Sequence, residues 1–214
     1  NYDFFYFLEK TFCTDKNSGW IPKHITLEEN KKIIGIIPNF KKLNSNGEYI
    51  FDHSWENAHY QLGLNYFPKY LSATPFTPVS RENFFYSKEK QKKISYYKEL
   101  KLFLENQKIS SFHINFIYKK TSEELKKNNF LQRIGIQYHW ENNNYNDFND
   151  FLSKLKSRKR KNIIKEREFL KKKKIYFSIK NGKEICKDDI TLFFKCYKNT
   201  INKKWSNEYL NINF

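Results

Sequence analysis

Short runs of β-branched and aromatic residues alternate with stretches of helical spacing along this 214-residue chain. Residues 33–38 are short and apolar, as a buried strand would be, and residues 110–118 alternate between apolar and polar side chains. Between these two runs, apolar residues recur at helical intervals over residues 88–106. Because helices and strands are interleaved, the sequence predicts a mixed α/β (α+β) fold in which helices pack against a sheet.

The same two patterns predict the remaining elements. Strands are expected over residues 48–52, 70–79, 131–140 and 175–179, and the second of these ends in a turn rigidified by Pro75 and Pro78. Helices are expected over residues 3–12, 54–62, 147–170 and 188–202, with a further short helix that begins at Thr121. The asparagine-rich stretch 141–144 predicts a boundary, because the character of the chain changes after it.

The composition indicates a folded and strongly basic protein. Hydrophobic residues make up 39% of the chain and the formal net charge is +17, so a core can form and polyanions are attracted. Nucleic acid, a nucleotide phosphate and an anionic membrane surface all fit such a charge. A bias towards A/T-rich codons, which encode Lys, Asn, Ile, Phe and Tyr, explains scattered lysines equally well.

Much of the positive charge is concentrated between residues 154 and 174, where twelve Lys or Arg residues accompany two Glu. Codon bias does not predict such a cluster, and it works against arginine, yet three of the five arginines of the chain lie here. Arginine forms bidentate contacts with phosphate. The sequence therefore predicts a phosphate-binding helix, with a solvated helix face as the alternative. The predicted binding residues are Arg158, Lys159, Arg160, Lys161 and Arg167.

Three side chains are candidates for acid–base chemistry. His113 and His139 lie on the less apolar faces of two predicted strands, and they would line one pocket if those strands were neighbours. Glu48 is a further candidate, as a base that deprotonates an amine nucleophile. The alternatives are hydrogen-bonded structural histidines and a solvated or capping carboxylate.

Missing motifs exclude several classes of site. The chain has no GxGxxG, P-loop, GxSxG, His-x-x-x-His or cysteine-rich spacing, so we expect no metal and no dinucleotide. Its three cysteines lack CxxC spacing, which favours a reducing cytoplasm, and no run approaches about 20 consecutive apolar residues, so no membrane span is expected. Since the chain contains no methionine and ends in an apolar stretch, we expect both ends to be cut.

Six motifs follow one another along the chain. They are GWIPKH at 19–24, GEYIFD at 47–52, YFPKY at 66–70, PFTPV at 75–79, QYHW at 137–140 and the segment 148–163, which contains SRKRKNI. As an ordered set, these motifs resemble the bacterial FemAB-like family of peptidoglycan biosynthesis/recognition proteins, a branch of the GNAT superfamily of acyl-CoA N-acyltransferases. The resemblance covers nearly the whole chain.

The resemblance implies two GNAT-like modules in tandem. Residues 1–145 would form most of the first module, and residues 146–214 would form the basic helix and the start of a truncated second module. The segment 159–163 is similar to the one that opens the second module in Fem-type peptidyltransferases. The pyrophosphate loop of ordinary GNAT enzymes, R/Q-x-x-G-x-G/A, is absent, because the spacing at 133–135 does not match.

The resemblance also implies a function. The first hypothesis is an N-acyltransferase or aminoacyltransferase that moves an acyl group from acyl-CoA or aminoacyl-tRNA to an amine, possible acceptors including a cell-wall precursor. The partners would be a phosphate-bearing donor, a cell-wall precursor and tRNA. The second hypothesis is a non-catalytic protein that recognises a cell-wall precursor or nucleic acid through the basic helix.

Overall fold

The computed structural model describes residues 2–87, 96–204 and 206–214. The chain divides into two compact units, of which the first comprises residues 1–132 and 191–214 and the second residues 133–190. The boundary predicted between residues 145 and 146 falls inside the second unit, and the two-module division stays a prediction.

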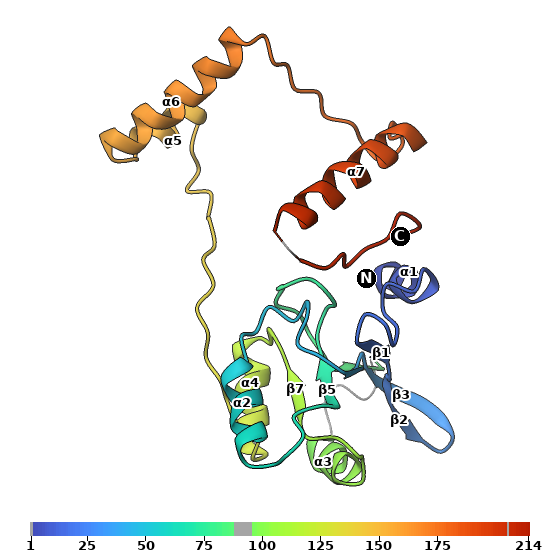
Figure 1. Cartoon of the computed structure of the whole chain (residues 1–214). Helices are drawn as coiled ribbons and strands as arrows, with labels where there is room; N and C mark the ends of the chain where they lie inside the picture. The colour runs from blue at the N-terminus through green and yellow to red at the C-terminus, as the bar shows by residue number, and fades with distance from the viewer. Residues whose placement is uncertain (1, 88–95, 205) are drawn as a thin grey trace. The chain divides into compact units, whose positions relative to one another are not determined.

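A four-stranded sheet forms the centre of the first unit (Figure 1). Its strand order is β1 (Trp20–Pro22), β4 (Phe40–Lys42), β5 (Lys69–Ser72) and β7 (Phe112–Ile114). β4 is antiparallel to both β1 and β5, whereas β5 and β7 run parallel, with Leu71 opposite His113. The sheet is therefore mixed, and the carboxyl ends of β5 and β7 meet at the same edge.

A second sheet of three antiparallel strands belongs to the same unit. It has the order β2 (Ile25–Glu29), β3 (Lys32–Ile37) and β6 (Phe85–Tyr86). Gly35 lies opposite both Leu27 and Tyr86, and a side chain at this position would come within 2.9 Å of the Tyr86 ring. Glycine is therefore required where the three strands come together.

Four helices precede residue 128 in the described part of the chain, α1 (Tyr2–Lys10), α2 (His53–Gln61), α3 (Tyr97–Glu105) and α4 (Lys119–Lys127). Leu100 of α3 and Leu125 of α4 pack with Phe84 and Tyr97 in one hydrophobic cluster. A separate cluster comprises Trp20, Phe40, Leu71 and Ala73, with Phe5 and Phe76 packed against it. These two clusters bury the apolar faces that the periodicity predicts.

The C-terminal segment, residues 206–214, is anchored in the first unit. The Tyr209 ring stacks on Phe76 with centroids 5.0 Å apart, and the Asn211 side-chain amide donates a hydrogen bond to the Thr11 carbonyl at 2.6 Å. The chain reaches this segment through α7 (Lys187–Lys203), whose first residues belong to the second unit.

The second unit contains α5 (Phe148–Ser153) and α6 (Ser157–Lys172). The Asp147 carboxylate caps α5 by accepting a hydrogen bond from the Asp150 N–H at 2.8 Å. Residues 154–156 separate the two helices. The prediction of a single helix over residues 147–170 is therefore wrong, because two helices cover this range.

The prediction of a mixed α/β fold is confirmed, and the architecture is consistent with a GNAT-like fold. Three predicted strands are wrong, because residues 48–52, 131–140 and 175–179 contain no strand. Part of the predicted helix 88–106 lies outside the described residues, and its second half is α3.

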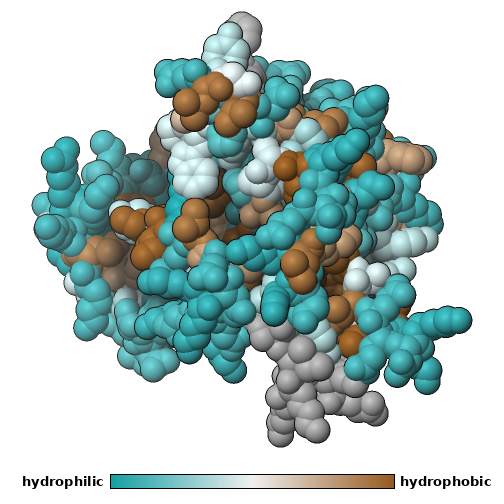
Figure 2. Space-filling model, turned by 90° about the horizontal axis from the view of Figure 1, so that it is seen from below, coloured by the Kyte–Doolittle hydropathy of each residue, from teal (hydrophilic) through white to brown (hydrophobic). Residues whose placement is uncertain are grey.

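No helix in the described ranges combines the length and the apolar character that a membrane span requires. Hydrophilic side chains cover most of the face shown in Figure 2, and apolar side chains are visible in separate places between them.

Candidate functional site

Five buried side chains form a charged network at the start of β5. Lys69 Nζ donates to Glu48 Oε2 at 3.0 Å and to Asp52 Oδ2 at 2.5 Å, and the Tyr66 hydroxyl donates to the same Asp52 oxygen at 2.6 Å. Lys42 Nζ lies 3.9 Å from Glu48 Oε1. Both lysines and both carboxylates have fully buried side chains. The network holds two charges of each sign, so burial leaves no net charge behind.

The local sequence explains how these residues converge. Asp52 is the N-terminal residue flanking α2, yet its carboxylate forms no cap hydrogen bond and points inward to Lys69 instead. The Asn46 carbonyl accepts hydrogen bonds from the Trp20 indole at 2.8 Å and from Lys42 Nζ at 3.3 Å. The Lys42 ammonium also lies 3.8 Å above the Trp20 ring, which is a cation–π contact.

Burial and pairing shift the pKa values within the network. Burial lowers the pKa of Lys42 to about 7, against the opposing attraction of Glu48. Burial also raises the pKa of Glu48, although both lysines act in the opposite direction. At Asp52, burial acts to raise the pKa, but the hydrogen bonds from Lys69 and Tyr66 outweigh burial, and the pKa is lowered to about 2.

His113 lies beside this network. Its ring meets the rings of Tyr66 and Trp55 edge-on, at centroid distances of 6.2 Å and 6.1 Å. Its Nε2 lies 3.0 Å from the Ser111 hydroxyl oxygen. Two of the predicted catalytic residues, Glu48 and His113, are therefore connected through Tyr66, Asp52 and Lys69.

The carboxyl end of β5 differs from its start in backbone conformation. Both parallel strands are followed by a residue in the left-handed region, Phe76 at φ +56° and Phe116 at φ +53°. The Phe76 ring is held at 5.3 Å from Trp20 and stacks on Tyr209. Such backbone is strained for an aromatic residue, and strained turns at the carboxyl ends of parallel strands are frequent at ligand sites.

Arg81 lies at this edge, just after the PFTPV motif. Its backbone N–H donates to the Phe116 carbonyl, its Nε donates to Thr74 Oγ1 at 2.8 Å, and its Nη1 donates to the Glu82 carbonyl oxygen at 2.8 Å. The guanidinium also lies 5.3 Å from the centre of the Phe5 ring. Burial lowers the pKa of Arg81 to about 10.

The Arg81 guanidinium is attracted by the Glu82 carboxylate, which partly opposes the effect of burial. Within the described residues it forms no ion pair, and its buried Nη2 has no hydrogen-bond partner. A desolvated guanidinium without an ion pair is costly unless an anion binds to it. The arrangement therefore fits a site for a phosphate or carboxylate group, which arginine binds with two parallel hydrogen bonds.

Other polar atoms around Arg81 are also without partners among the described residues. The Asn115 N–H donates to the Ser72 carbonyl at 3.1 Å, and the Asn83 amide donates to the Asn115 carbonyl at 3.3 Å. Ser72 Oγ, Asn83 Oδ1 and Asn115 Nδ2 are nevertheless buried and unpaired. Buried polar groups are usually hydrogen-bonded, so this concentration at one edge of the sheet marks the candidate site.

Sequence reasoning missed this part of the site. Arg81 is one of only five arginines in a lysine-rich chain, and it follows directly on the proline-locked turn. These two facts together are the signal that could have identified it. The unpaired states of Ser72 and Asn115 depend on tertiary packing, and no sequence pattern indicates them.

The predicted phosphate-binding residues lie together on α6, and two of them make contacts within the protein. The Arg167 guanidinium lies 4.2 Å from the centre of the Phe148 ring, and Arg160 Nη1 donates to the Ser153 carbonyl at 3.5 Å. Arg158, Lys159 and Lys161 are exposed near the start of the helix. The arrangement is compatible with anion binding by these three residues.

His139 belongs to the second unit, and it is not brought together with His113 by a pair of neighbouring strands. Its side chain is exposed, and its Nε2 lies 3.0 Å from the Gln137 side-chain oxygen. The predicted pairing of the two histidines required a strand over residues 131–140, which is absent.

Comparison with known proteins gives one match. The sequence model of the FemAB-like family, described as peptidoglycan biosynthesis/recognition, matches residues 1–214. No curated protein and no solved structure matches the chain.

Proposed function

The chain belongs to the FemAB-like family of peptidoglycan biosynthesis/recognition, and on that premise we propose that it is an N-acyltransferase of the aminoacyltransferase type. The acceptor would be an amine on a cell-wall precursor, and the donor an acyl group activated on tRNA or on coenzyme A. The observation that carries this proposal is the Arg81 guanidinium at the carboxyl edge of β5 and β7. Among the described residues it forms no ion pair, and its Nη2 has no hydrogen-bond partner. Both donors present phosphate groups that such a guanidinium binds.

The reaction requires few groups from the protein. The amine nitrogen attacks the acyl carbon, a C–N bond forms, and the bond from the acyl carbon to the donor oxygen or sulfur breaks. The proton lost by the amine passes to the departing oxygen or sulfur. Catalysis then consists of orienting the two substrates and stabilising the oxyanion of the tetrahedral intermediate.

Residues at the edge of the sheet suit these tasks. Asn115 Nδ2 is a buried donor without a partner in the described structure, and in this proposal it donates to the oxyanion. His113 lies two residues before it in the chain, on β7, and Asn115 follows directly on the end of that strand. His113 would accept the proton of the amine.

Glu48 has a different place in the proposal. Its carboxylate is enclosed with Lys42 and Lys69, and a group that accepts a substrate proton must be within reach of the substrate. We therefore propose that Glu48 positions Lys69 and the strand that begins there. His139, on the exposed segment of the second unit, remains a candidate for contact with the substrate.

The test is transfer of a radiolabelled amino acid or acetyl group to a cell-wall precursor, measured with both donors. We expect turnover with one donor, a roughly tenfold rise in its KM for Arg81→Gln, and a roughly 100-fold fall in kcat for Asn115→Ala. Arg133→Gln, an exposed arginine of the second unit, is the charge-matched control. Wild-type kinetics in Arg81→Gln would contradict the assignment.

A second candidate function is recognition without catalysis, and the exposed basic residues of α6 favour it. In that case, neither donor is turned over, and a precursor or RNA binds with an affinity that falls steeply with salt. Arg158→Gln would lower the slope of log K against log salt by about one unit. Arg167→Gln would change the slope less, since that side chain stacks on Phe148.

A further inference from the structure

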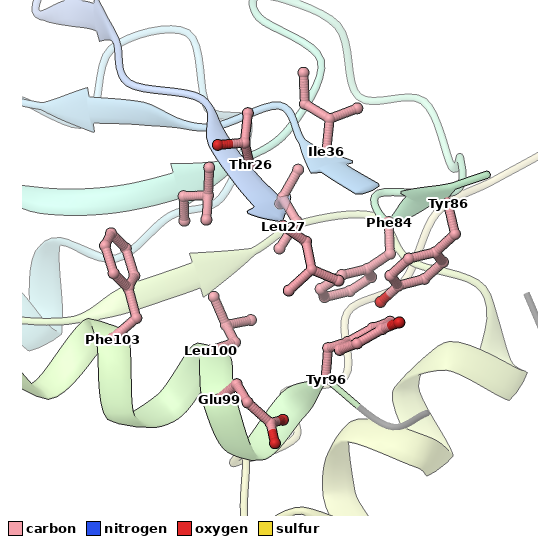
Figure 3. A pocket seen from close by; sticks show the side chains of 11 residues that line it. Thr26, Leu27, Ile36, Phe84, Tyr86, Tyr96, Glu99, Leu100 and Phe103 are labelled. Carbon is pink, nitrogen blue, oxygen red and sulfur yellow. The ribbon is translucent and has the colours of Figure 1, made fainter. Parts of the chain in front are cut away.

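A pocket in the first unit is lined by none of the residues of the charged network or of the Arg81 edge. It has a volume of about 200 Å³ and lies between α3 and the three-stranded sheet. Ile25, Leu27 and Leu100 form much of its wall, and Phe84 and Phe103 add aromatic surface (Figure 3). Because a cavity of roughly 150 Å³ accepts benzene, this pocket has room for about eight non-hydrogen atoms.

Two tyrosines stand at one end of the pocket. The rings of Tyr86 and Tyr96 lie one against the other, with centroids 5.4 Å apart and planes inclined by 32° (Figure 3). The Tyr96 hydroxyl is buried and has no hydrogen-bond partner among the described residues. A buried phenol without a partner favours a ligand that presents a hydrogen-bonding group here.

Two carboxylates of the described residues, Glu99 and Glu124, lie in or near the pocket wall, although the protein as a whole is strongly basic. Glu99 belongs to the pocket wall, and the Glu124 carboxylate accepts a hydrogen bond from the Tyr97 hydroxyl at 3.2 Å, one residue from Tyr96. Burial raises the pKa of Tyr86 to about 12, and Tyr96, Glu82 and Glu124 add to the effect. A cation is therefore favoured at this end of the pocket, and an anion is disfavoured.

We infer that this pocket binds a primary alkylammonium group on a short aliphatic stem. The stem contacts the wall formed by Ile25, Leu27 and Leu100. The ammonium lies against the tyrosine rings and donates a hydrogen bond to the Tyr96 oxygen. Glu99, an exposed residue whose carboxylate points away from the two tyrosine rings, adds a weak long-range attraction (Figure 3). A quaternary ammonium has no N–H to donate to Tyr96, which is why a primary amine fits better. The inference does not depend on the proposed transferase activity.

Calorimetric titration of the whole chain with three six-carbon probes tests the inference. Hexylammonium should bind with a Kd of about 1 mM or below, 1-hexanol at least about tenfold more weakly, and hexanoate not measurably. Equal affinity for hexylammonium and 1-hexanol would reduce the site to an apolar cavity and overturn the inference, as would the absence of heat with hexylammonium.

Two variants identify the groups that bind. Tyr96→Phe keeps the ring and removes the hydroxyl, and it should weaken hexylammonium about fivefold. Glu99→Gln should weaken hexylammonium about threefold. Glu105→Gln is the matched control, because Glu105 is exposed on the same helix and lies outside the pocket wall. Equal losses in Glu99→Gln and Glu105→Gln would also overturn the inference.

Discussion

Buried charges are paired at the start of β5, whereas the buried charge at its far end forms no ion pair within the described residues. At its start, Lys69 lies between Glu48 and Asp52, and Lys42 completes a network in which every charge has an opposite neighbour within 3.9 Å. At its far end, Arg81 is desolvated and forms no ion pair within the described residues. Only a few residues of one strand separate these two environments.

From this difference we infer that the start of β5 stabilises the fold and that its far end binds a ligand. A buried network without net charge stabilises one arrangement of the chain, because removing any one of its four charged groups leaves a net charge buried. An unpaired guanidinium gives the fold little by itself, and it becomes favourable when an anion arrives. Variants at the start of β5 should therefore affect stability, and variants at its far end should affect binding.

The largest effect is expected for Lys69→Met. This change leaves two buried carboxylates with one lysine between them, so the free energy of unfolding should fall by about 3–5 kcal/mol. Equilibrium unfolding in urea measures it. Lys101→Met, at an exposed position of α3, is the control and should stay within about 0.5 kcal/mol. A fall of less than 1 kcal/mol in the free energy of unfolding of Lys69→Met would show that the network does not stabilise the fold.

A smaller effect is expected for Glu48→Gln. Lys69 keeps Asp52, and Lys42, whose pKa is already lowered to about 7, can lose its proton instead of remaining a buried charge. The free energy of unfolding should fall by about 1–3 kcal/mol. If Glu48 instead acts as the base for a substrate, the variant would lose turnover while its unfolding curve stayed unchanged.

The dependence of stability on acid sharpens the comparison further. The pKa of Asp52 is about 2 in the folded chain and 3.8 ordinarily, so its contribution is complete above about pH 5 and is lost as the pH falls towards 2. Thermal melting between pH 4 and 2 should show this loss, and Asp52→Asn should flatten it. If Asp52→Asn lost thermal stability between pH 4 and 2 to the same extent as the parent chain, a group other than Asp52 would be responsible for the loss.

Much of the fold follows from local pattern, and the exceptions have a common cause. The apolar periodicity of residues 3–12 and 188–202 predicts α1 and α7, because helical hydrogen bonds form within one segment. A strand needs a neighbour as well as an alternating pattern. Ile136 and Tyr138 alternate as a strand requires, yet they are 86% and 94% exposed in a segment without a strand partner.

The candidate site was predictable only in part for a related reason. Glu48 and His113 were chosen from their residue types, and both lie near the start of β5 or beside it. Their neighbours Lys69 and Asp52 are ordinary residues of a lysine-rich chain until folding buries them. The site at Arg81 is identified by a desolvated guanidinium that forms no ion pair among the described residues, and only the folded structure shows this.

The stability of Arg81→Met tests the central claim most directly. Methionine keeps an aliphatic stem of similar length and removes the charge, together with the hydrogen bonds to Thr74 and Glu82 and the guanidinium contact with the Phe5 ring. If the far end of β5 is a binding site, equilibrium unfolding in urea should stay within about 1 kcal/mol of the parent chain, while Lys69→Met loses several times more. A loss of 3 kcal/mol or more in Arg81→Met would show that both ends are architecture and would contradict the assignment.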